Sequence, residues 1–204
     1  MASTDRTADA ASERNLFITV SGTPGSGVTT LCEGLANALN CGYVSGGELF
    51  REVAEERGVS LSQLTARAGE SEELDRALDR RLRTIAETWG AANNSFVLES
   101  RLAGWLAGNR ADFRIWLDAP EEVRSERTSD REETTAEMQV REVLDAARYE
   151  SYYGIDLDDR SIYDLALNSG RWGESSLQEI VLTALREYDP VADEGEFVVP
   201  AFEP

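Results

Sequence analysis

The chain has 204 residues, of which 39 are acidic and 20 basic, so its formal net charge is −19; every basic residue is arginine, because the sequence contains neither lysine nor histidine. The acidic balance argues against nucleic acid as a partner, since no basic stripe is present, and no apolar run is long enough to cross a membrane. The absence of histidine and lysine excludes histidine-based nucleophilic triads, the usual zinc ligand sets and Schiff-base chemistry, which leaves carboxylates, hydroxyls, backbone amides, arginine and metal ions.

The apolar pattern predicts strands that alternate with helices. Strands are expected at residues 16–20, 43–44, 96–98, 113–117 and 162–167, and helices at 29–40, 48–57, 72–89 and 175–188, with a further short helix that a Ser60–Gln63 capping box begins. The segment 121–149 follows Pro120 and reads as a charged helical stretch. This alternation is typical of an α/β fold in three layers, with a mainly parallel five-stranded sheet covered by helices on both faces.

The two ends of the chain differ in composition from its centre. Residues 1–14 are small, polar and charged and are expected to form a disordered leader, and residues 189–204 are expected to form a loosely held acidic tail around a single domain at 15–188. With two cysteines there is no disulfide framework, which predicts a reducing, cytoplasmic setting. The charge itself is explained either by a salt-rich cytoplasm, which screens self-repulsion, or by an acidic protein with an unusual lifestyle; we favour the first.

A glycine-rich loop lies between the first predicted strand and the first predicted helix. Glycines in this position let backbone amides converge on phosphate oxygens, and the helix N-terminus adds its positive end. The loop is therefore predicted to hold the phosphates of a nucleoside triphosphate, which makes this a P-loop fold. Its nine residues are Gly22, Thr23, Pro24, Gly25, Ser26, Gly27, Val28, Thr29 and Thr30.

One position of this loop departs from the pattern G-x-x-x-x-G-K-[ST]. Val28 stands where the lysine is expected, whereas Thr29 stands where the motif places its magnesium ligand. Lysine normally reaches the β and γ phosphates, so its loss affects the expected catalytic rate more than nucleotide binding. The alternative is a turn rich in glycine and serine that binds no ligand.

Five segments, the phosphate loop among them, resemble archaeal-type cytidylate kinases and recur in the family's order over roughly residues 16–187. They are the phosphate loop itself, Val44–Arg51, Leu98–Trp105, Ile115–Pro120 and the stretch from Tyr153 to Leu165. The resemblance implies transfer of the γ-phosphoryl group of ATP to CMP or dCMP, with Mg²⁺, by a kinase that has a monophosphate-binding arm at about 45–90 and a lid at about 121–153.

The resemblance also implies a site for the acceptor nucleotide. Ser45, Gly46 and Arg51 would line the monophosphate pocket, and Arg51 would grip the acceptor phosphate. Arg101 follows the third predicted strand, where ligands of open α/β sheets collect, and its planar fork suits phosphate. Glu99 would hold magnesium through water, together with Thr29; pairing with Arg101 is the alternative role for Glu99.

The predicted lid supplies further arginines. The candidates for neutralising the transferred phosphoryl group are Arg124, Arg127, Arg131, Arg141 and Arg148, and with Arg101 the catalytic set is expected to be Arg101, Arg127, Arg141 and Arg148. The alternative is a solvated helix face, mainly for Arg124 and Arg131. The family's lid commonly reads Arg and then Ser-Glu a few residues before Arg-Tyr, whereas this chain has Val143-Leu144-Asp145. The segment 168–170 would lie near the adenine, or is a plain turn.

Two rival functions remain open at this stage. One is a small P-loop kinase for another acceptor, such as AMP or shikimate, and the other is a nucleotide-binding protein that has lost catalysis. Val28 and the altered lid favour the second of these. In each case the partners are small-molecule nucleotides rather than nucleic acid or a membrane, and a monomer is expected.

Overall fold

The computed structural model describes residues 15–59, 63–64, 72–92, 94–129, 135–189 and 199–204. The predicted leader, the Ser60 cap and Arg131 lie outside the described residues.

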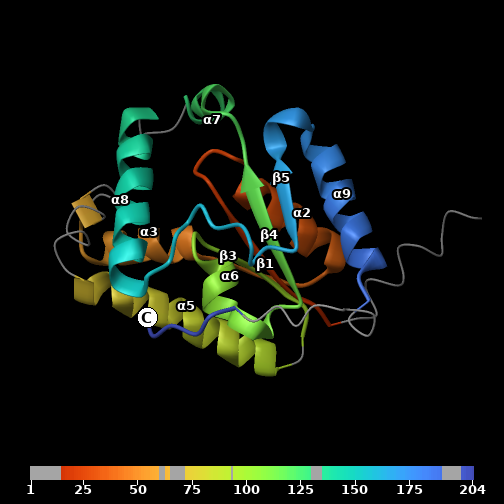
Figure 1. Cartoon of the computed structure of the whole chain (residues 1–204), viewed down its shortest axis with the longest axis horizontal. Coiled ribbons are helices and arrows are strands. Elements are labelled where there is room, and N and C mark those ends of the chain that lie inside the picture. The colour runs from red at the N-terminus through yellow and green to blue at the C-terminus, as the bar shows by residue number, and fades with distance from the viewer. Residues whose placement is uncertain (1–14, 60–62, 65–71, 93, 130–134, 190–198) are drawn as a thin grey trace, which may run out of the picture.

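The centre of the molecule is one parallel sheet (Figure 1). Its strands are β1 (Phe17–Gly22), β2 (Gly42–Ser45), β3 (Phe96–Glu99), β4 (Phe113–Asp118) and β5 (Leu165–Asn168). They lie in the order β2-β3-β1-β4-β5, and all four pairings are parallel, which confirms the predicted fold class. Glu99 is in register with Val20 of β1 and Ser45 of β2, so the carboxyl ends of these strands meet at one edge.

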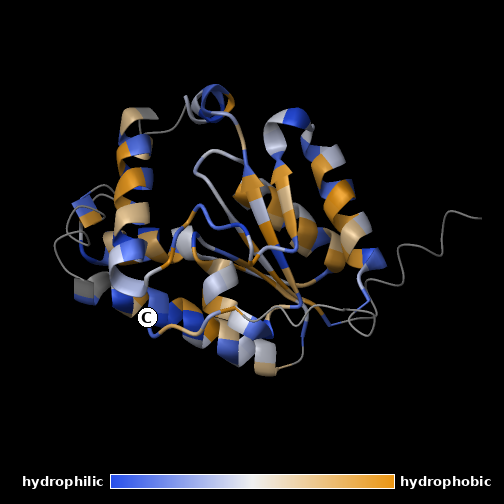
Figure 2. Ribbon diagram, viewed as in Figure 1, coloured by the Kyte–Doolittle hydropathy of each residue, from blue (hydrophilic) through white to orange (hydrophobic). Residues whose placement is uncertain are grey.

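Alternate side chains of the strands fill two separate cores. Ile18, Val20 and Val97 lie in a cluster beneath α2 (Val28–Leu39) and α9 (Glu174–Glu187). Phe17 and Phe96 point the other way, into a cluster with residues of α5 (Glu72–Ala91) and α6 (Ala103–Ala107). Successive side chains of a strand point to opposite faces of the sheet, and here both faces are apolar, as a sheet covered by helices on both sides requires. Figure 2 shows the apolar strands between helices whose outer faces are hydrophilic.

The structure differs from the predicted elements in three places. The charged stretch 121–149 is two helices, α7 (Glu121–Thr128) and α8 (Thr135–Tyr153). The short α6 was not predicted; all five of its residues are buried, so it has no polar face to give it a helical period. The last strand begins at Leu165 rather than at residue 162, because Ile162 and Tyr163 belong to a turn and are buried against the α5 side of the sheet.

The end of the chain is held more firmly than its composition predicts. Val199 is buried in the core, and the Phe202 ring packs against Tyr153 at 4.8 Å between centroids. Three arginines of α5 bind backbone carbonyls of this segment: Arg83 donates to Phe202, Arg76 to Glu203 at 3.1 Å and Arg80 to Pro204 at 3.3 Å. Residues 199–204, hereafter the C-terminal strap, therefore join α5 to the end of α8.

Deleting residues 199–204 is expected to lower thermal stability. Burial of a valine or phenylalanine side chain contributes about 1.5–3 kcal/mol, so losing both should reduce the melting temperature by about 5 °C or more. Deleting only residues 203–204 removes two carbonyl contacts but leaves both apolar side chains, and should cost clearly less. Equal melting temperatures for the full chain and the longer deletion would contradict the packing of the strap.

Candidate active site

The glycine-rich loop bends back on itself at the carboxyl end of β1. Gly25 and Gly27 have φ values of 78° and 92°, a region that L side chains rarely adopt, and Gly27 caps α2. A Cβ atom on Gly22 would lie 2.2 Å from the Leu117 carbonyl oxygen, so only glycine lets β1 pass β4 here. The Thr23 hydroxyl donates to Asp118 at 2.8 Å and fixes the loop to the end of β4.

The outer side of the loop is held by α7. Arg124 donates to the Pro24 carbonyl at 3.2 Å and pairs with Glu142 of α8 at 2.8 Å. Arg127 donates to the Ser26 carbonyl at 3.3 Å and to both the hydroxyl and the carbonyl of Ser169, at 2.9 and 3.0 Å. Arg124 therefore does not belong to a solvated face. Arg127 connects the loop to the turn at 168–170 and, in this conformation, does not line the pocket.

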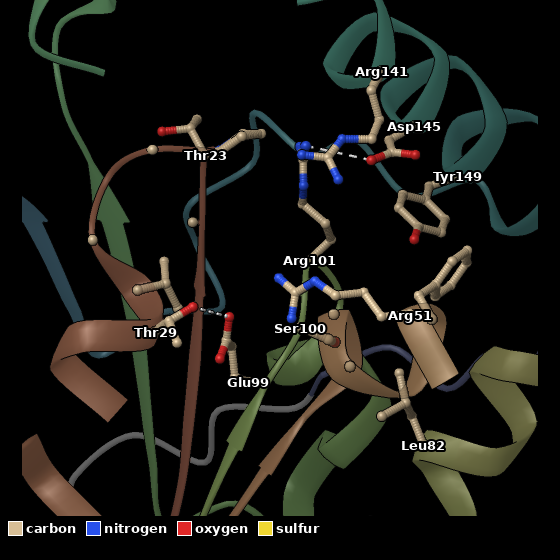
Figure 3. A pocket seen from close by; sticks show the side chains of 18 of the residues that line it. Thr23, Thr29, Arg51, Leu82, Glu99, Ser100, Arg101, Arg141, Asp145 and Tyr149 are labelled. Carbon is tan, nitrogen blue, oxygen red and sulfur yellow. Dashed lines mark hydrogen bonds and ion pairs between the residues drawn. The ribbon is translucent and has the colours of Figure 1, made fainter. Parts of the chain in front are cut away.

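The inner side of the loop opens into a pocket (Figure 3). Its walls come from the loop, the start of α3 (Gly46–Glu56), the end of β3, and the inward faces of α5 and α8. Four arginines line it, Arg51, Arg101, Arg141 and Arg148, beside the carboxylates Asp79, Glu99 and Asp145. In a chain with a net charge of −19, this local gathering of cations is able to attract an anion.

At the end of the pocket next to the phosphate loop, the Glu99 carboxylate accepts two hydrogen bonds. The Thr29 hydroxyl donates to Glu99 at 3.0 Å, and the Tyr43 hydroxyl donates to the other oxygen of Glu99. Burial and this hydrogen bond raise the pKa of Tyr43 well above its usual range, so Tyr43 stays a neutral donor that orients the carboxylate. Among the described residues, no group of three or more acidic, cysteine or histidine side chains could hold a metal alone. Thr29 and Glu99 nevertheless suit Mg²⁺, because this ion keeps several waters and takes phosphate oxygens as further ligands.

The N-terminus of α3 faces the same pocket. Gly46 and Gly47 line it, and a Cβ on Gly46 would lie 2.9 Å from the Ser100 side chain and 3.2 Å from the Glu99 carbonyl oxygen. Glycine thus lets the first turn of α3 come against the end of β3. The Ser45 hydroxyl accepts from the Glu48 amide at 3.3 Å and caps this helix instead of lining the pocket. Arg51, one turn further on, points into the pocket beside Arg101 (Figure 3).

Asp145 joins two of the arginines. It lies 3.3 Å from the Arg101 guanidinium and 2.7 Å from that of Arg148, and its side chain is only 8 % exposed. A carboxylate this deeply buried needs both partners to offset its desolvation. The Arg101 contact is an ion pair without hydrogen-bond geometry, and the Nη2 atom that makes it has no hydrogen-bond partner among the described residues.

The structure thus brings together most of the residues predicted from the sequence. Gly22–Gly25, Gly27–Thr30, Gly46, Arg51, Glu99, Arg101, Arg141 and Arg148 line one pocket. Ser26, Ser45, Arg127 and the turn at 168–170 lie behind its walls, with Asn168 accepting from the Gly170 amide at 2.9 Å. Sequence reasoning did not single out Phe50, Asp79, Leu82, Ser100 or Tyr149. The spacing of residues 141, 145, 148 and 149 on one helical face could have identified the α8 wall.

Comparison with known proteins agrees with this geometry. A family model described as an AAA domain matches residues 18–150. The cytidylate kinase of Natronomonas pharaonis is 48 % identical over 186 residues, which cover 89 % of this chain and 95 % of that protein. The cytidylate kinase of Pyrococcus furiosus is 43 % identical over 185 residues, covering 88 % of this chain and 93 % of that one. The chain belongs to the cytidylate kinase family.

Solved structures place this cytidylate kinase family member among P-loop folds. Shikimate kinase from Acinetobacter baumannii aligns with a TM-score of 0.55 at 15 % identity, covering 86 % of this chain and 95 % of that one. A gluconokinase from Sinorhizobium meliloti aligns with a TM-score of 0.55 at 17 % identity, covering 84 % and 93 %. At such identities the likeness concerns the fold alone. No helix in the described part of the chain is long and apolar enough to span a bilayer.

Proposed function

We propose that this cytidylate kinase family member transfers the γ-phosphoryl group of ATP to CMP, and also to dCMP, giving CDP or dCDP and ADP. The observation that supports this best is the single pocket in which the phosphate loop faces the N-terminus of α3 and four arginines. Such a pocket can hold a donor and an acceptor phosphate against each other. Membership of the family supplies the identity of the base.

The chain's own groups suffice for the chemistry, which needs positioning and charge neutralisation more than a covalent catalyst. The loop amides and the N-terminus of α2 would hold the donor phosphates. Arg51 and Arg101, with the N-terminus of α3, would bind the acceptor phosphate. Arg101 would also balance charge on the transferring group, together with Arg141 and Arg148. Mg²⁺, held by Thr29 and by Glu99 directly or through water, would neutralise charge on the donor phosphates.

The lid and arm assignments follow from the same pocket. We propose that residues 45–90 form the monophosphate-binding arm and residues 121–153 the lid, because α3, α5 and α8 supply opposite walls. Closure of α8 would exclude water from the transferring group and would carry Arg141 and Arg148 with it, since both line the pocket from this helix. Arg127 would act in the lid by holding the phosphate loop to Ser169, rather than by contacting the phosphoryl group itself.

Val28 is the observation that favours a second function, nucleotide binding without turnover. Its side chain packs partly on the α2 core cluster and also lines the pocket, and it can donate no hydrogen bond to a phosphate. Arginines from α3, β3 and α8 converge on the same space, which supports retained activity.

The experiment that separates the two functions is a coupled assay with ATP, Mg²⁺ and a panel of CMP, dCMP, UMP, AMP and shikimate in molar KCl. CMP and dCMP should be the preferred acceptors; phosphorylation of AMP or shikimate in preference would contradict the proposal.

We also propose that this is a cytoplasmic protein adapted to high salt. With a net charge of −19, self-repulsion is strong in dilute buffer, whereas at about 1 M salt the Debye length falls to about 3 Å. The melting temperature and the rate of CDP formation should therefore rise together from dilute buffer to molar KCl. A melting temperature that stays constant over this range would exclude the adaptation. Sucrose at matched osmolality is the control, because it favours burial without screening charge.

A further inference from the structure

The end of α8, the main helix of the proposed lid, is bound by an arginine from another helix. The last carbonyls of a helix lack partners within it and carry its negative end, and the last turn of α8 has no basic residue of its own. Arg76 of α5 supplies the cation: its guanidinium donates to the Tyr152 carbonyl at 3.2 Å. It also lies 5.5 Å and 5.0 Å from the ring centroids of Tyr152 and Tyr153, within the range of a cation–π contact.

The same guanidinium holds the C-terminal strap. Nη2 of Arg76 makes the bond to α8, and Nη1 donates to the Glu203 carbonyl at 3.1 Å. The strap returns to α8 through Phe202, whose ring lies 4.8 Å from that of Tyr153. Arg76 therefore joins three segments that are distant in the sequence: α5, the end of α8 and the strap. Figure 1 shows the C-terminus beside α5 and the lower end of α8.

The bound end of α8 is the point from which its pocket-lining arginines are placed. The helix ends at Tyr153, and the chain turns at Gly154, which has a φ of 65°. Arg148 and Arg141 lie five and twelve residues before Tyr153, which at about 1.5 Å per residue is about 8 and 18 Å along the axis. A tilt of about 5° at this end would therefore move the backbone of Arg148 by about 0.7 Å and that of Arg141 by about 1.6 Å. A misplacement of about 1 Å can lower an enzymatic rate by about a hundredfold.

Other contacts of α8 act within the lid or within the pocket. Arg124 of α7 pairs with Glu142 at 2.8 Å, which joins α8 to another part of the proposed lid. Asp145 pairs with Arg101 at 3.3 Å inside the pocket, where a bound phosphate would compete for the same guanidinium. Arg76 does not line the pocket, so its contacts with α8 need not break when a ligand binds.

We propose that Arg76 is a positioning residue for phosphoryl transfer. Because it binds the end of α8 and the strap at once, it fixes the angle of α8 against the arm helix α5. It thereby sets where Arg141 and Arg148 stand in the pocket, and it acts through α8 rather than by touching the substrates. This inference rests on the proposed function, since the angle of α8 matters for turnover only if α8 acts as the lid of a kinase.

The kinetic test compares two arginine to methionine changes on α5. Arg76→Met keeps the apolar stem and removes the guanidinium, so kcat should fall by about tenfold or more. KM for ATP and for CMP should stay within about threefold, because the phosphate loop, Arg51 and Arg101 are unchanged. Arg76→Lys keeps a cation with donors and should recover part of kcat. Arg80 donates to the Pro204 carbonyl of the strap at 3.3 Å, so Arg80→Met is the matched control for loss of an arginine–strap bond and should keep kcat.

The angle of α8 can be measured without turnover. Val143, on α8, is 68 % exposed, and Arg81, on α5, is exposed as well. Spin labels at Val143→Cys and Arg81→Cys, in a full chain whose two free cysteines are replaced by alanine, give the distance between the two helices by pulsed electron paramagnetic resonance. The distance distribution should broaden or shift in Arg76→Met and stay unchanged in Arg80→Met. All variants are compared in molar KCl, well below their melting temperatures.

The outcomes separate this inference from a structural role and from the proposed function. Equal losses of kcat in Arg76→Met and Arg80→Met, or a loss without a change in the distance, would show that Arg76 only supports the fold. A changed distance with wild-type kcat would also overturn the inference, because turnover would then not depend on the angle of α8. A wild type that forms no CDP, with the distance changed in Arg76→Met alone, would contradict the kinase activity and still support the placement of α8 by Arg76.

Discussion

Replacing Arg51 or Arg101 with alanine is expected to raise KM for CMP by roughly ten- to a hundredfold, because each removes a charge-assisted partner of the acceptor phosphate. Binding of ATP should stay near that of wild type, since both arginines lie on the α3 and β3 side of the pocket rather than on the phosphate loop. Steady-state kinetics with CMP varied at saturating ATP give the KM, and titration with a non-hydrolysable ATP analogue gives the donor affinity.

The two variants should differ in stability, which adds a check that does not depend on activity. Arg101 pairs with the buried Asp145, so Arg101→Ala leaves that carboxylate with Arg148 alone and should lower the melting temperature. Arg51 is exposed, so Arg51→Ala should leave the melting temperature unchanged. Arg110→Ala is the control for loss of one cation, because Arg110 is 47 % exposed and pairs with Glu87 outside the pocket. Loss of ATP binding with CMP affinity intact would show that the acceptor site is placed wrongly.

Replacing Thr29 with valine is expected to lower kcat by about a hundredfold or more, because the variant keeps the shape of the side chain but lacks the hydroxyl proposed to bind Mg²⁺. The Mg²⁺ concentration needed for half-maximal rate should rise as well, which a purely structural defect would not produce. Kinetics at saturating ATP and CMP with Mg²⁺ varied measure both quantities.

A matched change elsewhere tests whether the Thr29 effect is specific. Thr84 lies on the exposed side of α5, where its hydroxyl donates to the Arg80 carbonyl, and Thr84→Val should leave kcat and the Mg²⁺ dependence unchanged. Wild-type kcat and Mg²⁺ dependence in Thr29→Val would remove Thr29 from the proposed metal site.

The parts of the site that the sequence predicts are those encoded by neighbouring residues. The phosphate loop is one contiguous segment in which Gly25 and Gly27 occupy positions with positive φ, so its conformation follows from local chemistry. Glu99 and Arg101 were predicted because they stand at the end of a buried strand and just after it, and parallel strands present their carboxyl ends at one edge. The parallel pairing of the strands followed likewise from the alternation of strands and helices, whereas the strand order is known from the structure alone.

The parts that the sequence does not predict depend on how distant helices face each other. Asp79 stands next to Leu78 in the apolar stripe of α5, yet only the placement of α8 and the strap shows that it lines a pocket. The charged sequence of 121–149 does not show which face of its helices turns toward the pocket. Arg127 was therefore assigned to the phosphoryl group, whereas in this conformation it binds Ser26 and Ser169. The strap was unexpected because acidic composition hides the two apolar side chains that anchor it.

The central claim is that a phosphate loop with valine at position 28 still supports phosphoryl transfer, because arginines from three other elements supply the missing charge. The measurement is formation of labelled CDP from γ-³²P-ATP and CMP by wild type and by Val28→Lys, with both substrates saturating, Mg²⁺ present and KCl at molar concentration. Wild type should form CDP, and Val28→Lys should change the rate only modestly, because the added cation enters a pocket already lined by four arginines. A wild type that binds ATP but forms no CDP above background would contradict the account, most clearly if Val28→Lys restored the activity.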